Sequence, residues 1–153
     1  MEDVQASKAP VHLWIVGILG LLWNAIGCYD YFMTRTRNTD YFTSMMPNVD
    51  PAAALAWVDS FPMFAQFGWG LGVWGGLLGS VLLLMRSKWA TIVLGLSMLG
   101  AIISLGYQVL AAAPPPPGMM DEGPAALMPY VIIAIAIGLF LYARAQQQKG
   151  VLR

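Results

Sequence analysis

Residues 61–85 read FPMFAQFGWGLGVWGGLLGSVLLLM, a stretch of twenty-five residues without a charged side chain. A helix needs about 20 mostly apolar residues to cross the hydrocarbon core of a bilayer. Pro62 stands near the start of the stretch, where a helix tolerates proline because the N–H that proline lacks has no partner there. The stretch therefore predicts a membrane-spanning helix.

Three further stretches on either side meet the same criterion, namely residues 11–33, 89–112 and 126–144. Arg86, Ser87 and Lys88 predict a tight charged turn between the second and third spans, and the prolines at 114–117 end the third because proline cannot continue a helix. The apolar run at 11–33 is longer than that of a signal peptide, so we expect it to be retained. The predicted fold is an all-α membrane protein, one domain over residues 1–153 built as an antiparallel bundle of four transmembrane helices.

The composition agrees with a lipid-facing surface. Hydrophobic residues make up 58% of the 153 residues and charged residues only 10%, against roughly 25% charged residues in soluble domains. The formal net charge is zero, so no basic surface is available for nucleic acid. A single cysteine, Cys28, excludes an internal disulfide and a cysteine-based zinc site.

No arrangement of residues in the sequence is typical of an enzyme. There is no Ser/His/Asp set, no pair of carboxylates on one helix face and no phosphate-binding loop after a strand. The single histidine, His12, also rules out haem sites that need two histidines. We therefore expect no catalysis, no cofactor and no metal centre as the default.

The distribution of Lys and Arg predicts the orientation of the chain. Six of these residues fall on one side of the predicted membrane and two on the other; the six are Lys8, Arg86, Lys88, Arg144, Lys149 and Arg153, and the two are Arg35 and Arg37. Short cytoplasmic loops carry an excess of positive charge. This asymmetry predicts that both termini are cytoplasmic.

The outer segment between the first two spans, about 35–60, contains a helix signal. Asp50 followed by Pro51 is typical of an N-cap and first helical position, and it precedes the apolar run 52–58. We expect a short helix at the membrane interface, anchored by Trp57.

Small or polar residues recur in three spans at alternating spacings of three and four, a mean period of 3.5 that keeps one face toward a neighbouring helix. Small residues also allow close approach of helices in lipid. This pattern predicts a compact bundle with the fourth span more peripheral; alternatively, one glycine face is an interface between copies of the chain. The three sets are Gly17, Gly20, Asn24, Gly27, Tyr31; Ala65, Gly68, Gly72, Gly75, Gly79; and Ser97, Ala101, Ser104, Gln108, Ala111.

Asp30 is an ionisable residue within a predicted span. Such residues raise a functional hypothesis because burying a charge in a membrane is costly. A rise of about 1.5 Å per residue puts Asp30 level with Tyr107 and Gln108. One interpretation is an outward-facing pocket in which Asp30 binds a cation, a proton or a substrate hydroxyl; its lining would be Asn24, Asp30, Tyr31, Tyr107 and Gln108.

The other interpretation, which we favour, is structural. Asp30 lies within one turn of the outer interface, where it can pair with Arg35 or Arg37 or reach headgroup water. Asn24 and Gln108 then serve as hydrogen bonds between helices, each worth about 0.6–2 kcal/mol.

Methionines gather in the predicted outer segments or at their edges, seven of the ten in the chain. Thioethers favour Cu(I) as ligands, so a copper site built from Met45, Met46, Met119 and Met120 is a third hypothesis, which a lack of any effect of Cu(I) on thermal stability would contradict. The alternative is that methionine, an adaptable apolar residue, serves in packing.

The residues Trp23-Asn24, Gly27, Asp30-Tyr31, Met33-Thr34, Thr36-Arg37-Asn38 and Tyr41 resemble a family of small bacterial four-span proteins, and the resemblance continues through Val73-Trp74-Gly75-Gly76. Members of that family are uncharacterised and sometimes labelled "sugar transporter". The resemblance implies a bacterial inner-membrane protein. It also implies that Asn24, Asp30 and Arg37 are the positions to test first.

Two functions from different classes remain open. The first, which we favour, is a membrane component without its own catalysis, an accessory or scaffold subunit whose partners are the bilayer and other membrane proteins. The second is a small-solute transporter or channel that acts as a homo-oligomer, with Asp30 in its polar site.

Overall fold

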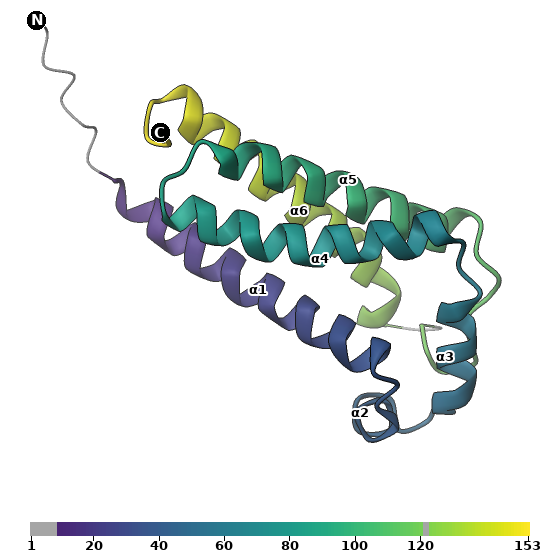
Figure 1. Ribbon diagram of the computed structural model, residues 1–153. Coiled ribbons are helices and arrows are strands. Elements are labelled where there is room, and N and C mark those ends of the chain that lie inside the picture. The colour runs from purple at the N-terminus through teal and green to yellow at the C-terminus, as the bar shows by residue number, and fades with distance from the viewer. Residues whose placement is uncertain (1–8, 121–122) are drawn as a thin grey trace, which may run out of the picture.

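Residues 9–120 and 123–153 are described by the computed structural model, and they form six helices (Figure 1). Four of these helices are long and apolar enough to span a membrane: α1 (Val11–Arg35), α4 (Met63–Leu84), α5 (Trp89–Leu110) and α6 (Pro124–Gln148). They match the four predicted spans to within a few residues at each end, which confirms the predicted all-α, four-helix architecture. Lys8, one of the six basic residues in the predicted charge asymmetry, lies outside the described residues, as do Asp121 and Glu122.

The four long helices run alternately up and down. Helix α4 packs against α1 and against α5, and α5 also packs against α6. The start of α1, the α4–α5 turn and residue 153 lie at one end of the bundle, here called the terminal end. The opposite end, here called the loop end, carries two short helices, α2 (Thr39–Met45) and α3 (Pro51–Asp59).

The predicted seams of α1 and α4 face inward, as expected. In α1, Gly17 lies against Leu84 of α4, and Gly27 lies against Val73. In α4, the glycines at 68, 72, 75 and 79 all lie against α5, where they meet Ser104, Ala101, Ser97 and Leu94 in turn. The glycine face of α4 is therefore an internal contact of this chain. The α5 seam follows the prediction only from Ser97 to Ser104.

The terminal end is closed by the last residues of the chain. Val151 and Leu152 are buried in the same apolar cluster as Leu13 and Leu83. Two backbone hydrogen bonds of 2.8 Å join residue 153 to the α4–α5 turn, where Arg86 has a φ of 59°. The Arg86 Nε–H also donates to the carbonyl oxygen of Val151 at 3.1 Å. The C-terminal segment thus fixes a turn whose backbone conformation is unfavourable for a non-glycine residue.

The loop end contains the predicted short helix and one that was not predicted. The Asp50 side chain accepts a hydrogen bond from the Ala52 N–H at 3.1 Å, which confirms the N-cap of α3. Trp57 does not extend to the surface as the predicted anchor: it is 9% exposed, and its Nε1–H donates to the carbonyl oxygen of Ala113 at 2.7 Å. The segment after α5 thereby folds over α3. The Trp57 indole is buried against this segment and so does not contact the membrane interface.

Helix α6 is the least buried of the four spans, as predicted for the fourth. Leu139 and Ala143 join the apolar cluster at the terminal end, whereas nothing lies within 4 Å of the position that a side chain on Gly138 would take. Near the terminal end, His12 of α1 and Tyr142 of α6 are joined by a hydrogen bond.

Candidate functional site

Asp30 lies in the penultimate turn of α1 and is partly buried. The Tyr41 hydroxyl, from α2, donates a hydrogen bond of 2.7 Å to the Asp30 Oδ1 atom. The Tyr29 ring meets the Tyr41 ring edge to face, with 5.6 Å between their centroids. Burial raises the pKa of the Tyr41 hydroxyl, and its hydrogen bond to the Asp30 carboxylate raises that pKa further because ionisation would set two negative charges side by side. The pair therefore favours the protonated phenol.

Neither arginine that was considered as a partner of Asp30 pairs with it. The Arg37 Nη2 atom lies 2.7 Å from Asp59 Oδ2 at the end of α3, and both side chains are exposed. Arg35 donates to Gln66 Oε1 at 2.9 Å, and its guanidinium lies over the rings of Tyr31 and Trp69. Arg35 thus connects the end of α1 to α4, and Arg37, just after α1, connects the chain to α3.

Asn24 lies in the middle of α1 and points into the bundle, as the seam predicted. Its Nδ2 donates to the Gly20 carbonyl at 2.8 Å and to Ser80 Oγ at 3.3 Å. Ser80 in turn donates to the carbonyl of Gly76 at 2.8 Å. The same polar strip continues on α5, where Ser97 donates to the Gly72 carbonyl at 2.6 Å. These contacts join three helices.

The two tyrosines of the predicted polar site lie in aromatic clusters. Tyr31 meets Trp69 and Trp74 of α4 edge to face. Tyr107 meets Phe61, which precedes α4, and Phe64 in the first turn of that helix. Both rings thus pack between helices, and the contacts are made by the rings and not by the hydroxyl groups.

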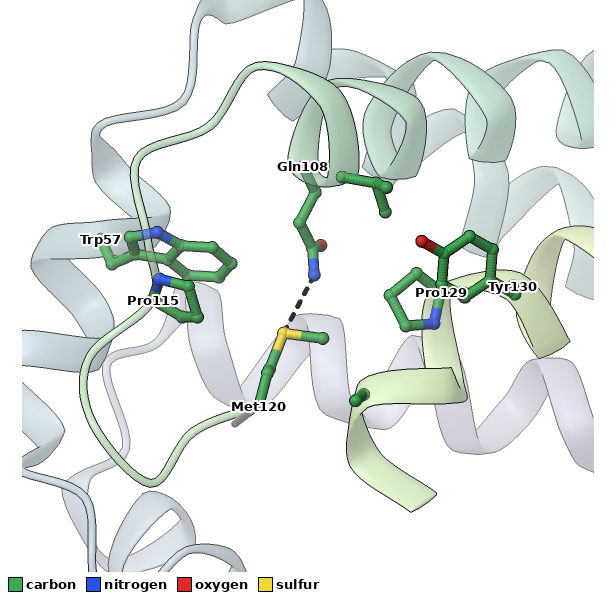
Figure 2. Close-up of a pocket in the computed structure, with 8 residues that line it drawn as sticks. Trp57, Gln108, Pro115, Met120, Pro129 and Tyr130 are labelled. Carbon is green, nitrogen blue, oxygen red and sulfur yellow. Dashed lines mark hydrogen bonds between the residues drawn. The ribbon is translucent and has the colours of Figure 1, made fainter. Parts of the chain in front are cut away.

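Gln108 occupies a separate pocket at the loop end (Figure 2). The cavity has a volume of about 190 Å³ and lies between α3, the end of α5, the following segment and the start of α6. Figure 2 shows Gln108 between Trp57 and Pro115 on one side and Pro129 and Tyr130 on the other. The Gln108 Nε2 atom donates to the Met120 sulfur at 3.1 Å.

The predicted site residues are therefore distributed over several places. Within the described part of the chain, no hydrogen bond, ion pair or ring contact joins any two of these six: Asn24, Asp30, Tyr31, Arg37, Tyr107 and Gln108. The actual partners of Asp30 and Arg35, namely Tyr41 and Gln66, were not in the predicted set. Gln66 lies away from the glycine face of α4, yet its place in the first turn of that helix matches the depth of Arg35 at the end of α1.

Three of the four methionines proposed as copper ligands take part in packing at the loop end. Met46 and Met119 pack against the cluster that contains Phe42 and Val49. Met120 lines the pocket with Gln108, and Met45 is 64% exposed. These contacts are those of adaptable apolar side chains.

No protein-family model, curated protein or solved structure matches the chain. The geometry of the four spans and of the loop end is therefore the basis on which a function is proposed.

Proposed function

We propose that this chain is an integral membrane protein without its own catalysis that acts as an accessory or scaffold subunit of a larger membrane assembly. The proposal rests on the hydrogen bonds that the polar side chains inside the membrane form. Asn24, Ser80 and Ser97 each bond to a neighbouring helix or to their own backbone. Such bonds hold helices together, whereas a solute path needs polar groups that face an open cavity.

The lateral surface supports the same proposal. Large apolar side chains are exposed along α1, α5 and α6, including Ile15, Leu96 and Leu141, each about half exposed. Such faces suit lipid or another membrane helix. A small protein with such lateral faces is well suited to bind beside a larger partner.

A bacterial inner-membrane location with the terminal end in the cytoplasm is part of this proposal. Among the described residues Arg86, Lys88, Arg144, Lys149 and Arg153 belong to the terminal end, against Arg35 and Arg37 at the loop end. The test uses Cys28→Ser as background, with one added cysteine at Thr43 in α2 or at Gln147 in α6. An impermeant maleimide applied to intact cells should label Thr43→Cys alone; labelling of Gln147→Cys alone would reverse the orientation.

The central experiment is affinity purification from membranes in mild detergent, with the mass of the complex and its composition measured together. The tag belongs at the N-terminus because Val151 and Leu152 are buried at the other end. We expect a partner at fixed stoichiometry. Three sets of alanine replacements then map its contact: Ile15, Ile18 and Leu22 of α1; Ile92, Leu96 and Leu99 of α5; Leu127, Val131 and Leu141 of α6.

Each set serves as the matched control for the other two. Loss of the partner with one set and retention with the others would support a specific lateral interface. Recovery of the chain alone at its own mass would contradict an accessory role.

A second candidate is solute transport by a homo-oligomer, and Asp30 is the observation that favours it. This carboxyl group lies inside a span, and its hydrogen-bond partner among the described residues is the uncharged Tyr41 hydroxyl. A homo-oligomer in the purification, followed by solute uptake in proteoliposomes that Asp30→Asn abolishes, would establish transport in place of the accessory role.

A further inference from the structure

The pocket around Gln108 is apolar over most of its surface but contains unused hydrogen-bonding groups. None of its described lining residues is charged. The Gln108 Nε2–H bonds to the Met120 thioether, which is a weak acceptor. Within the described residues, the Gln108 Oε1 atom and the Tyr130 hydroxyl have no hydrogen-bond partner. The pocket thus offers an amide N–H whose present acceptor is weak, an amide oxygen without a partner among the described residues, and a phenol hydroxyl.

The chemistry of the lining restricts what can bind. An ionised group would leave water without a counter-charge among the described lining residues, which is costly. A hydrocarbon guest alone would leave the Gln108 amide with its weak partner. A neutral guest with one carbonyl or hydroxyl group satisfies both the apolar walls and the amide.

The size of the pocket fits a small guest. Its volume of about 190 Å³ exceeds the ~150 Å³ of an apolar cavity that holds a benzene molecule. The walls are Trp57 and Pro115 on one side and Pro129 and Tyr130 on the other, with Gln108 and Met120 between them (Figure 2). The pocket also lies where α5 ends and α6 begins, the depth at which spanning helices reach the headgroup region.

We propose that this pocket binds a neutral guest in which a hydrocarbon or aromatic body carries an ester or hydroxyl group. The Gln108 amide forms a hydrogen bond with that group, and the Trp57 and Tyr130 rings lie against the apolar part of the guest. Two sources supply this chemistry: the glycerol-ester region of a membrane lipid, and a free aromatic alcohol. The proposal is independent of the accessory role.

The test uses the full chain in detergent micelles, with the Trp57 indole N–H followed by NMR and assigned through Trp57→Phe. The probes are dioleoylglycerol for the lipid source and benzyl alcohol for the free source. Ala126→Phe places a ring in the pocket, since Ala126 is one of its lining residues. Ala125→Phe is the matched control, because Ala125 is the exposed neighbouring residue and does not line the pocket.

We expect at least one probe to shift the indole signal in a saturable manner. Ala126→Phe should abolish that saturation, Ala125→Phe should preserve it, and Gln108→Leu should weaken binding by about threefold to tenfold, the effect of one neutral hydrogen bond. Saturation by dioleoylglycerol alone assigns the pocket to lipid, and saturation by benzyl alcohol alone assigns it to a free molecule. Saturation by neither probe, or equal loss in Ala125→Phe and Ala126→Phe, would overturn the proposal; helix content by circular dichroism confirms that each variant is folded.

Discussion

A methyl group on Gly100 would lie 2.6 Å from the carbonyl oxygen of Gly68, because α5 and α4 touch here through their main chains. The contact is reciprocal, since a methyl group on Gly68 would lie 2.9 Å from the Gly100 carbonyl oxygen. Lipid provides no hydrophobic force between helices, so packing of this kind is what holds them together. This crossing therefore sets the position of the two central helices.

Gly100→Ala should destabilise the protein by about 1–3 kcal/mol, because the added methyl group forces two backbones apart. Gly106→Ala is the matched control on the same helix, since nothing lies within 4 Å of the position its methyl group would take. That control should be neutral or stabilising by up to about 1 kcal/mol, the gain in helix propensity. Unfolding in mixed micelles of increasing dodecyl sulfate content measures both. Equal stability of the two variants would show that α4 and α5 are not in main-chain contact.

The seams of α1 and α4 could be predicted from sequence because the period of small residues in a helix fixes which face meets a neighbour. Gly100 was missed because it lies beside Ala101, and both face α4 although only Ala101 fits the alternation of three and four. Gln108 was placed in the seam but sits near the end of α5, where the chain turns toward the pocket. A regular pattern thus predicts the middle of a span better than its last turn.

The partners of the polar site could not be predicted because the loop end has no period to follow. Tyr41 reaches Asp30 from α2, a helix of seven residues, which is too short for an apolar period to be recognised. The chain enters α2 after Arg37, which has a φ of 55°, in the left-handed region that glycine favours. Nothing in an arginine indicates such a reversal.

Tyr41→Phe should destabilise the protein by about 1–2 kcal/mol, since it removes a hydrogen bond to a carboxylate and leaves Asp30 without that partner. From neutral pH up to pH 10 the effect should be constant. The pKa of Tyr41 is raised above its ordinary value of 10.0, so its contribution to stability is complete below that value and is lost only as the pH rises through the higher pKa of the folded protein.

Absorbance of tyrosinate measures this pKa directly. A late ionisation step should belong to Tyr41, and that step should be missing in Tyr41→Phe. In Asp30→Asn it should move to lower pH, because the neighbouring negative charge is gone while the burial remains. An unchanged late step in Asp30→Asn would show that the two side chains are not in contact.

Trp57→Phe should loosen the segment that follows α5. The indole N–H bond to the Ala113 carbonyl is lost while an aromatic ring remains, so the cost is about 0.5–1.5 kcal/mol and local. Hydrogen exchange should accelerate in α3 and in residues 118–120 and remain unchanged in α4. Trp14→Phe is the control, since Trp14 is 45% exposed in α1. Faster exchange throughout the bundle in Trp57→Phe would contradict a local role.

Leu152→Ala should destabilise the terminal end by about 2–3 kcal/mol, because Leu152 is 4% exposed within the apolar cluster that joins the bundle helices. Leu141→Ala removes the same atoms from a side chain that is 53% exposed, so it should change stability by much less. Thermal unfolding in detergent compares the two. A Leu152→Ala variant as stable as Leu141→Ala would mean that the C-terminal segment is not docked.

Asn24 and Gly76 should be energetically coupled across the α1–α4 contact. A methyl group on Gly76 would overlap the Asn24 side chain, whose Nδ2 is held by the Gly20 carbonyl and Ser80. Gly76→Ala therefore forces Asn24 to give up these hydrogen bonds, and Asn24→Ala loses them directly at about 0.6–1.7 kcal/mol. In the double variant the overlap with Asn24 is absent, which leaves room for the new methyl group.

The double variant should consequently be more stable than the sum of the two single effects, with a coupling of about 0.5–3 kcal/mol. Unfolding of all four proteins in the same mixed micelles gives this value. Gly138→Ala combined with Asn24→Ala is the control pair and should be additive, since Gly138 has open space around it. Additivity in the Gly76 pair as well would mean that Asn24 faces lipid, and the polar strip through α1, α4 and α5 would then have to begin at Ser80.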